Sequence, residues 1–164
     1  MSIGKRLIEA LDGLIESGAT DNNGGTRRLE VTQGPRRIVC DVVTAGPLGC
    51  SLERFALETA ELADATPPRL KAVSDALAAR LTYLLEAISP VEVDEDHCVV
   101  QMRSNPPQRD DDGMSYYELL VTRGGQLSLC RYAKQPGGRR RQIPAQFTRE
   151  VVARLAADFA AVLG

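Results

Sequence analysis

Tryptophan is absent from this sequence of 164 residues, histidine occurs once, and aromatic residues make up only 4% of the chain. Neither sign of charge dominates, because 20 Lys and Arg stand against 22 Asp and Glu, for a formal net charge of -2. This balance disfavours a protein that coats nucleic acid. Hydrophobic residues at 43% exclude a disordered chain. A chain of this length buries about 70% of its unfolded surface on folding, which is enough for a core without metal or disulfide support.

Long apolar runs are missing as well. No segment reaches the roughly 20 apolar residues that a membrane-spanning helix needs. The first residues include Glu9, Asp12 and Glu16, so they predict an amphipathic helix and not a secretion signal. We therefore expect a cytoplasmic protein without a membrane partner.

Motifs for metal, cofactor or catalytic sites do not occur. The cysteines form no C-x-x-C pair, and three of them lie in strand patterns, where a free thiol acts as a small hydrophobe. They are Cys40, Cys50, Cys98 and Cys130. Dinucleotide-binding, Walker, zinc-protease and serine-hydrolase motifs are all absent from the sequence. The sequence therefore predicts no cofactor, no metal site and no enzyme.

The first part of the chain predicts a helix and a hairpin. Ser2 caps the helix, Gly18 ends it, and Asp21 to Gly25 form a turn-rich connection. Strands over residues 27–33 and 36–44 follow, joined by a two-residue loop at Gly34-Pro35. This loop pairs Val31 with Ile38, Leu29 with Cys40 and Arg28 with Asp41, which places the apolar side chains on one face.

The middle of the chain predicts one strand and one long helix. Residues 48–59 alternate in polarity and then change phase, which favours a bulged strand, with a short helix from Ser51 as the alternative. Thr66 then caps a long helix over residues 67–89, which Pro90 ends. Its apolar stripe consists of Leu70, Val73, Leu77, Leu81, Leu84, Leu85 and Ile88.

The last part predicts four strands and a helix. Strands over 91–94 and 98–103 precede a stretch, 104–113, that is too rich in proline and aspartate for regular structure. A hairpin over 116–123 and 126–133 turns at Gly124-Gly125 and pairs Tyr117 with Tyr132, Leu119 with Cys130, and Glu118 with Arg131. Thr148 caps the final helix.

These elements predict one α+β domain over residues 1–164. Its order is α-β-β-β-α-β-β-β-β-α, with an antiparallel, twisted sheet packed against a long central helix and two terminal helices.

Three clusters of chemistry-bearing residues have weak functional signals. His97 is the one imidazole base, but we expect it on the polar face of a strand, pointing away from its neighbour Cys98. The run Asp110–Asp112 lacks the ligand spacing of a calcium loop. The run Arg139–Arg141 binds anions or nucleic acid if it meets the arginines of the first hairpin, which are Arg27, Arg28, Arg36 and Arg37.

The last hairpin has apolar side chains on both faces. Such a hairpin is either covered on both sides within the chain or docks against another protein, and the sequence leaves both alternatives open. The candidate partner-binding residues are Tyr116, Tyr117, Leu120, Leu127, Leu129 and Tyr132. Replacing Leu120 and Leu129 with Asp discriminates between the alternatives, because only core positions unfold the protein.

In its order of elements, the chain resembles type III secretion chaperone-like proteins, whose helices bracket two groups of strands. The resemblance implies a cytosolic, non-catalytic homodimer that binds a protein or peptide client on an apolar surface. A chaperone-like binding module is therefore the leading hypothesis. The alternatives are a protein that binds nucleic acid or phosphate through its arginine clusters, and an enzyme with His97 or Asp110–Asp112 in a pocket.

Overall fold

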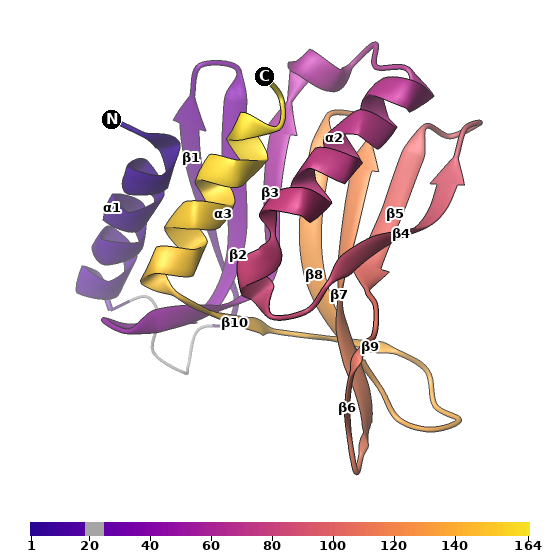
Figure 1. Cartoon of the computed structure of the whole chain (residues 1–164). Coiled ribbons are helices and arrows are strands. Elements are labelled where there is room, and N and C mark those ends of the chain that lie inside the picture. Colours follow the sequence, from indigo (N-terminus) through magenta and orange to yellow (C-terminus); the bar gives the residue numbers. More distant parts are fainter. Residues whose placement is uncertain (19–24) are drawn as a thin grey trace.

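The computed structural model describes residues 1–18 and 25–164. Within these residues, three α-helices form a layer over one face of an antiparallel sheet (Figure 1). The helices are α1 (Ile3–Glu16), α2 (Pro67–Arg80) and α3 (Arg149–Ala161), with two 3-10 turns, η1 (Ala60–Leu62) and η2 (Thr82–Leu84), on either side of α2. The predicted α+β class is confirmed. The predicted connection Asp21 to Gly25 lies outside the described residues except for Gly25.

The sheet contains ten strands in the described part of the chain, and its main path runs β1-β2-β3-β8-β7-β5-β4. The long strands are β1 (Arg27–Gln33), β2 (Arg36–Ala45), β3 (Gly49–Thr59), β4 (Ile88–Asp94), β5 (Val99–Ser104), β7 (Gly113–Thr122) and β8 (Gln126–Lys134). The short strands are β6 (Gln108–Asp110), β9 (Arg141–Ile143) and β10 (Ala145–Thr148). Strand β6 pairs with β7, β9 with β8, and β10 with β3.

All three helices begin at the predicted caps. The hydroxyls of Ser2, Thr66 and Thr148 accept the backbone N–H three residues further on, at 3.2, 3.3 and 3.2 Å. Each cap satisfies one of the N–H groups that the first helical turn leaves without a partner.

The prediction of one long helix over residues 67–89 is wrong for the second half of that range. Helix α2 stops earlier, Leu85 has a left-handed φ of 65°, and Ile88 already belongs to β4. The Tyr83 hydroxyl donates to Asp158 Oδ2 on α3 at 2.8 Å. The pairing of β4 with β5 and the anchoring of Tyr83 on α3 thus override a leucine stripe that also fits a helix.

The first hairpin and the strand after it are confirmed. Val31 pairs with Ile38 and Arg28 with Asp41, as the two-residue loop requires. Residues 49–59 form one strand whose register against β2 shifts between Asp41 and Val42, as a bulged strand does.

The predicted register of the second hairpin is wrong by one residue. Thr122 pairs with Gln126, so the loop holds three residues and not two, and Tyr117 lies opposite Arg131. Gly125 has a φ of 95°, and a Cβ atom there would overlap the carbonyl of Thr59. The Thr59 N–H donates to the Gly125 carbonyl at 2.8 Å. Contact with β3 therefore fixes the loop length.

Because a shift of one residue exchanges the faces of a strand, the correction moves several side chains. Leu127 and Leu129 join Tyr117, Leu119 and Val121 in the core beneath the helices. Of the two alternatives left open for this hairpin, burial within the chain therefore holds for Leu127 and Leu129, which are 0% and 2% exposed.

The stretch 104–113 is more regular than predicted. Its second half forms a hairpin, in which β6 pairs with β7 through Gln108 and Ser115.

None of the helices in residues 1–18 and 25–164 has both the length and the apolarity to cross a membrane.

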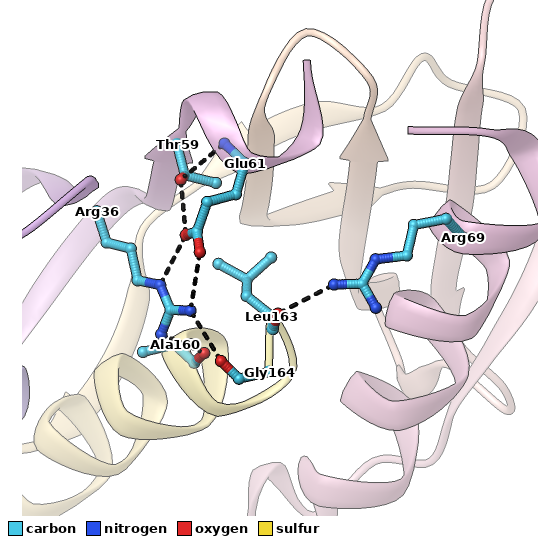
Figure 2. Close-up of polar contacts among 7 residues, drawn as sticks. All are labelled: Arg36, Thr59, Glu61, Arg69, Ala160, Leu163 and Gly164. Carbon is cyan, nitrogen blue, oxygen red and sulfur yellow. Dashed lines mark hydrogen bonds and ion pairs between the residues drawn. The ribbon is translucent and has the colours of Figure 1, made fainter. Parts of the chain in front are cut away.

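Two arginines fasten the end of α3 to the rest of the fold (Figure 2). Arg36 donates to both oxygens of Glu61, at 2.8 and 3.2 Å, and to the carbonyls of Ala160 and Gly164, at 2.9 and 3.2 Å. Arg69 donates to the carbonyl of Leu163 at 3.0 Å. Because the last carbonyls of a helix lack helical partners and carry partial negative charge, these guanidinium groups stabilise this end of α3.

Candidate functional site

A groove with a cavity volume of about 770 Å³ lies on the helix side of the sheet, beyond the end of α2. Three segments form its walls: the chain after η2, the connection between β5 and β6, and the junction of β9 with β10. Its floor is formed by Tyr117 of β7 and Arg131 of β8. We call it the Glu86–Arg131 groove, after the ion pair that it contains.

The wall between β5 and β6 arises from a bulge in the sheet. Arg103 pairs with Glu118 and Gln108 with Ser115, so the residues 104–107 face only two residues of β7. The two extra residues of this segment bulge out of the ladder, and Pro106 and Pro107 thereby line the groove. Because proline has no backbone N–H, neither residue needs a hydrogen-bond acceptor there.

Ser104 compensates for the ladder bond that the bulge removes. Its hydroxyl accepts the N–H of Tyr117 at 2.8 Å, and the residue is 2% exposed. The N–H of Asn105 donates to the carbonyl of Ala87 at 2.8 Å. This second bond ties the bulge to the wall that follows η2.

The wall after η2 presents an exposed leucine. Leu85 is 92% exposed, the largest fraction among the large hydrophobic side chains of the described residues. Its left-handed φ of 65° is a conformation that leucine rarely adopts, at a cost of order 1–3 kcal/mol. Leu85 thus carries backbone strain without burying its side chain within this chain.

The third wall is a single segment that changes its pairing partner at Pro144. Before the proline, Ile143 pairs with Arg131 of β8, and after it Ala145 pairs with Leu52 of β3. Ile143, Pro144 and Gln146 line the groove on this side.

Arg131 connects the floor with two of the walls. Its Nη1 donates to Oε2 of Glu86 at 2.9 Å, and its Nη2 donates to Gln108 Oε1 at 3.1 Å and to Ser115 Oγ at 2.9 Å. The guanidinium lies 4.4 Å from the centre of the Tyr117 ring. Burial raises the pKa of Tyr117 above its ordinary value. The groove therefore holds a fixed, mostly buried ion pair, with no net charge from these two residues.

The ion pair leaves one oxygen without a partner. Oε1 of Glu86 is buried and accepts no hydrogen bond from the described residues. A buried acceptor that stays unpaired costs about 1–3 kcal/mol, and more when it is charged. Since most buried polar groups in folded proteins are paired, this oxygen calls for an explanation.

The predicted partner-binding residues are divided among three environments. Tyr117 lies in the groove, and Leu127 and Leu129 lie in the core. Tyr116, Leu120 and Tyr132 lie on the sheet face that the helices do not cover, where Tyr116 and Tyr132 stack with ring centres 6.1 Å apart. The predicted set therefore does not form one surface.

The predicted pair of Glu118 with Arg131 is also replaced. Glu118 is 6% exposed on the helix-free face and accepts from Arg140 at 2.6 Å and from Gln101 at 2.9 Å. The Arg140 guanidinium lies 4.0 Å from the Tyr132 ring centre, and the Glu118 carboxylate raises the pKa of Arg140. Arg140, one of the three arginines of the predicted anion-binding run, is thus paired with a carboxylate of its own chain.

The two arginine clusters do not meet. Arg139 and Arg141 are exposed beside the end of β8, where Arg141 pairs with Ala133. Arg36 and Arg37 pair with the end of β3 that lies beside Gln126, at the start of β8. The length of β8, roughly 25 Å, separates them. These arginines also form ion pairs: Arg28 with Glu30, Arg36 with Glu61 and Arg37 with Glu58.

The candidate catalytic residues lie outside the groove. His97 belongs to a turn and not to a strand, and its Nδ1 lies 2.8 Å from Asp94 Oδ2. Hydrogen bonds from His97 lower the pKa of Asp94. Asp110 accepts the N–H of Asp112 at 2.9 Å in the hairpin turn. No group of three His, Cys, Asp or Glu that could hold a metal ion occurs in residues 1–18 and 25–164.

Sequence reasoning missed most of the groove. Glu86 and Arg131 are 45 residues apart, and neither belongs to a motif. Glu86 gave no local signal, because a charge at this position fits the polar face of the helix that the stripe Leu81, Leu84, Leu85 and Ile88 predicts. Arg131 was recognisable as a charge on an apolar hairpin, but its predicted partner was wrong.

Comparison of the chain with protein-family models, with curated proteins and with solved structures finds no match.

Proposed function

We propose that this protein is a non-catalytic binding module that takes an extended peptide segment of another protein into the Glu86–Arg131 groove. Leu85 is the observation that carries the proposal. A leucine at a positive φ is strained, and a leucine that is 92% exposed gains nothing from the hydrophobic effect within its own chain. A partner that covers this side chain gains about 1.5–3 kcal/mol.

The rest of the groove supports a peptide as the occupant. Its volume of about 770 Å³ lies in the range of ligand-binding sites. Leu84, Ile143 and the wall prolines offer apolar contacts, while Gln108, Ser115 and Gln146 offer uncharged polar groups. A peptide presents the same mixture, because each residue combines a polar main-chain amide with a side chain that is often apolar.

The test is selection from a displayed library of random peptides, followed by affinity measurement with two matched variants. Leu85→Asn removes the exposed leucine of the groove, and asparagine tolerates a positive φ. Leu48→Asn removes a leucine that is 89% exposed but does not line the groove. We expect selected peptides to bind Leu85→Asn at least about tenfold more weakly and Leu48→Asn unchanged.

Two results would contradict the proposal. One is a library that yields no binding peptide, or only peptides that bind the Leu85→Asn protein as tightly as the parent. The other is a dimer in light scattering that the Leu85→Asn change dissociates, because the occupant is then a second copy of this chain.

A further inference from the structure

The carboxylate of Glu86 has more capacity for hydrogen bonds than this chain uses. Two carboxylate oxygens accept up to about four hydrogen bonds. Arg131 supplies one, to Oε2 at 2.9 Å, and Oε1 receives none from the described residues. Glu86 lines the groove, so a donor from an occupant is well placed to complete the set.

Three residues in the walls of the groove offer no backbone donor. Pro106, Pro107 and Pro144 lack a backbone N–H. The two side chains nearest to the ion pair, Gln108 and Ser115, are oriented by Arg131, which uses their oxygens as acceptors. None of the described residues donates to Oε1 of Glu86, so an occupant of the groove can supply a donor there.

The charge of the ion pair indicates what kind of donor fits. Arg131 already balances Glu86 at 2.9 Å, and both side chains are mostly buried, at 11% and 13% exposure. A second cation beside Glu86 would be attracted by the carboxylate, but it would also be repelled by Arg131 and would lose its hydration in a mostly buried position, where its charge has no counter-ion of its own. An uncharged N–H meets no such repulsion.

Gln108 supplies the complementary group. Since its Oε1 accepts from Arg131 at 3.1 Å, the orientation of its amide is fixed and the NH2 end remains as a donor. A main-chain amide of a peptide has one N–H to give and one carbonyl to receive. It matches an acceptor at Glu86 and a donor at Gln108.

Glu86 Oε1 is enclosed in the structure, so the carboxylate has to turn toward the occupant. The last torsion of a glutamate side chain is broad, with low barriers between orientations. A rotation about this torsion would turn a carboxylate oxygen toward the groove that Glu86 lines, and the several donors of Arg131 could follow it.

From these observations, and resting on the proposed function, we infer that Glu86 recognises the main chain of the bound peptide. An uncharged main-chain N–H donates to the Glu86 carboxylate, and a main-chain carbonyl accepts from the Gln108 amide. The groove then selects extended segments that carry no Lys or Arg side chain at this point.

Three small probes of similar size test this inference by NMR titration of the full chain. N-acetyl-leucine N-methylamide has two uncharged N–H groups. Its fully N-methylated analogue has none, and leucine N,N-dimethylamide without the acetyl group has only the N–H groups of its ammonium. We expect the first probe to shift the resonances of the groove and to bind about tenfold more tightly than the other two.

Glu86→Gln is the decisive variant, because it keeps the shape of the side chain. Arg131 has only donors, so it holds the new amide oxygen and leaves the amide NH2 facing the occupant. Donor then faces donor, and the preference for the N–H probe should disappear. Glu92→Gln, on the exposed edge strand β4, should retain the preference.

The remaining outcomes overturn the inference. They are equal binding of all three probes, tightest binding of the ammonium probe, an unchanged preference in Glu86→Gln, and no shift of groove resonances at the solubility limit of the probes. Each of them leaves the proposed function standing if library peptides still depend on Leu85. The proposed function fails separately, when no selected peptide does.

Discussion

Arg131 and Glu86, 45 residues apart in the chain, form an ion pair of 2.9 Å in which both side chains are nearly buried. Glu86 follows η2, and Arg131 lies on a central strand of the sheet. The pair therefore joins the chain after α2 to the sheet within the groove.

Removal of one partner from this pair should be costly. Arg131→Met or Glu86→Leu leaves an uncompensated charge in a mostly buried position, and we expect a loss of about 3 kcal/mol in the free energy of unfolding. The double variant Glu86→Leu/Arg131→Met should lose less than either single variant, because no charge is stranded. Urea denaturation measures all three proteins. Additive losses would show that the two side chains do not depend on each other.

The two faces of the last hairpin can be separated by a matched pair of leucines. Leu129 is 2% exposed and lies in the core, while Leu120 is half-buried on the helix-free face. We expect Leu129→Ala to destabilise the protein by about 3 kcal/mol and Leu120→Ala by about 1 kcal/mol. Leu129→Asp should unfold the protein, and Leu120→Asp should not. Equal melting temperatures of the two Asp variants would argue against the register described above.

Adjacent glycines offer a second matched pair. Gly125→Ala places a Cβ against the Thr59 carbonyl at a φ of 95°, so we expect a loss of about 2 kcal/mol or more. Gly124→Ala meets only Thr122 Oγ1, at 3.6 Å, and should change stability by less than about 0.5 kcal/mol. Thermal unfolding compares the two variants. A tolerated Gly125→Ala would mean that the loop does not depend on its contact with β3.

The Arg36–Glu61 contact should make stability depend on acidic pH. The Arg36 guanidinium lowers the pKa of Glu61 below its ordinary value of 4.5, although burial opposes this. The unfolded chain therefore takes up this proton at a higher pH than the folded protein. The stabilisation is complete above the ordinary pKa and is lost as pH falls through the lower folded value.

Below about pH 5, the free energy of unfolding of Glu61→Gln should accordingly depend less on pH than that of the parent. At neutral pH the variant should lose up to about 1 kcal/mol and no more, because solvent screens exposed ion pairs. Arg36→Gln should flatten the stability curve in part, since it removes the main donor while the Thr59 hydroxyl still donates to Glu61. Urea unfolding from pH 3 to 7 measures the three curves. Parallel curves for the parent and Glu61→Gln would contradict the assignment.

The two long hairpins show where sequence reasoning succeeds and where it fails. Around Gly34-Pro35, only a two-residue loop places the apolar residues of both strands on one face, so the pattern determines the register. Around Gly124-Gly125, both faces contain leucine, as Leu119 and Leu120 illustrate. The pattern then fits two registers equally well. The contact between Gly125 and Thr59 on another strand decides between them.

The end of α2 was undecidable for a similar reason. Leu81, Leu84, Leu85 and Ile88 fit the spacing of a helix, and local propensity gives no reason to stop. The helix ends because β4 gains a ladder with β5 and because Tyr83 reaches Asp158. Both partners are remote in sequence.

The sequence alone was sufficient for the α+β class, the three helix starts at Ser2, Thr66 and Thr148, and the first hairpin. Those features depend on caps, turns and alternation among near neighbours, which local physics decides. Only the tertiary structure could decide the second register, the end of α2 and the groove. The ion pair of Glu86 with Arg131 joins two segments that become neighbours only when β7 and β8 pack beside the chain that leaves α2. No local sequence pattern indicates that these two segments lie close together.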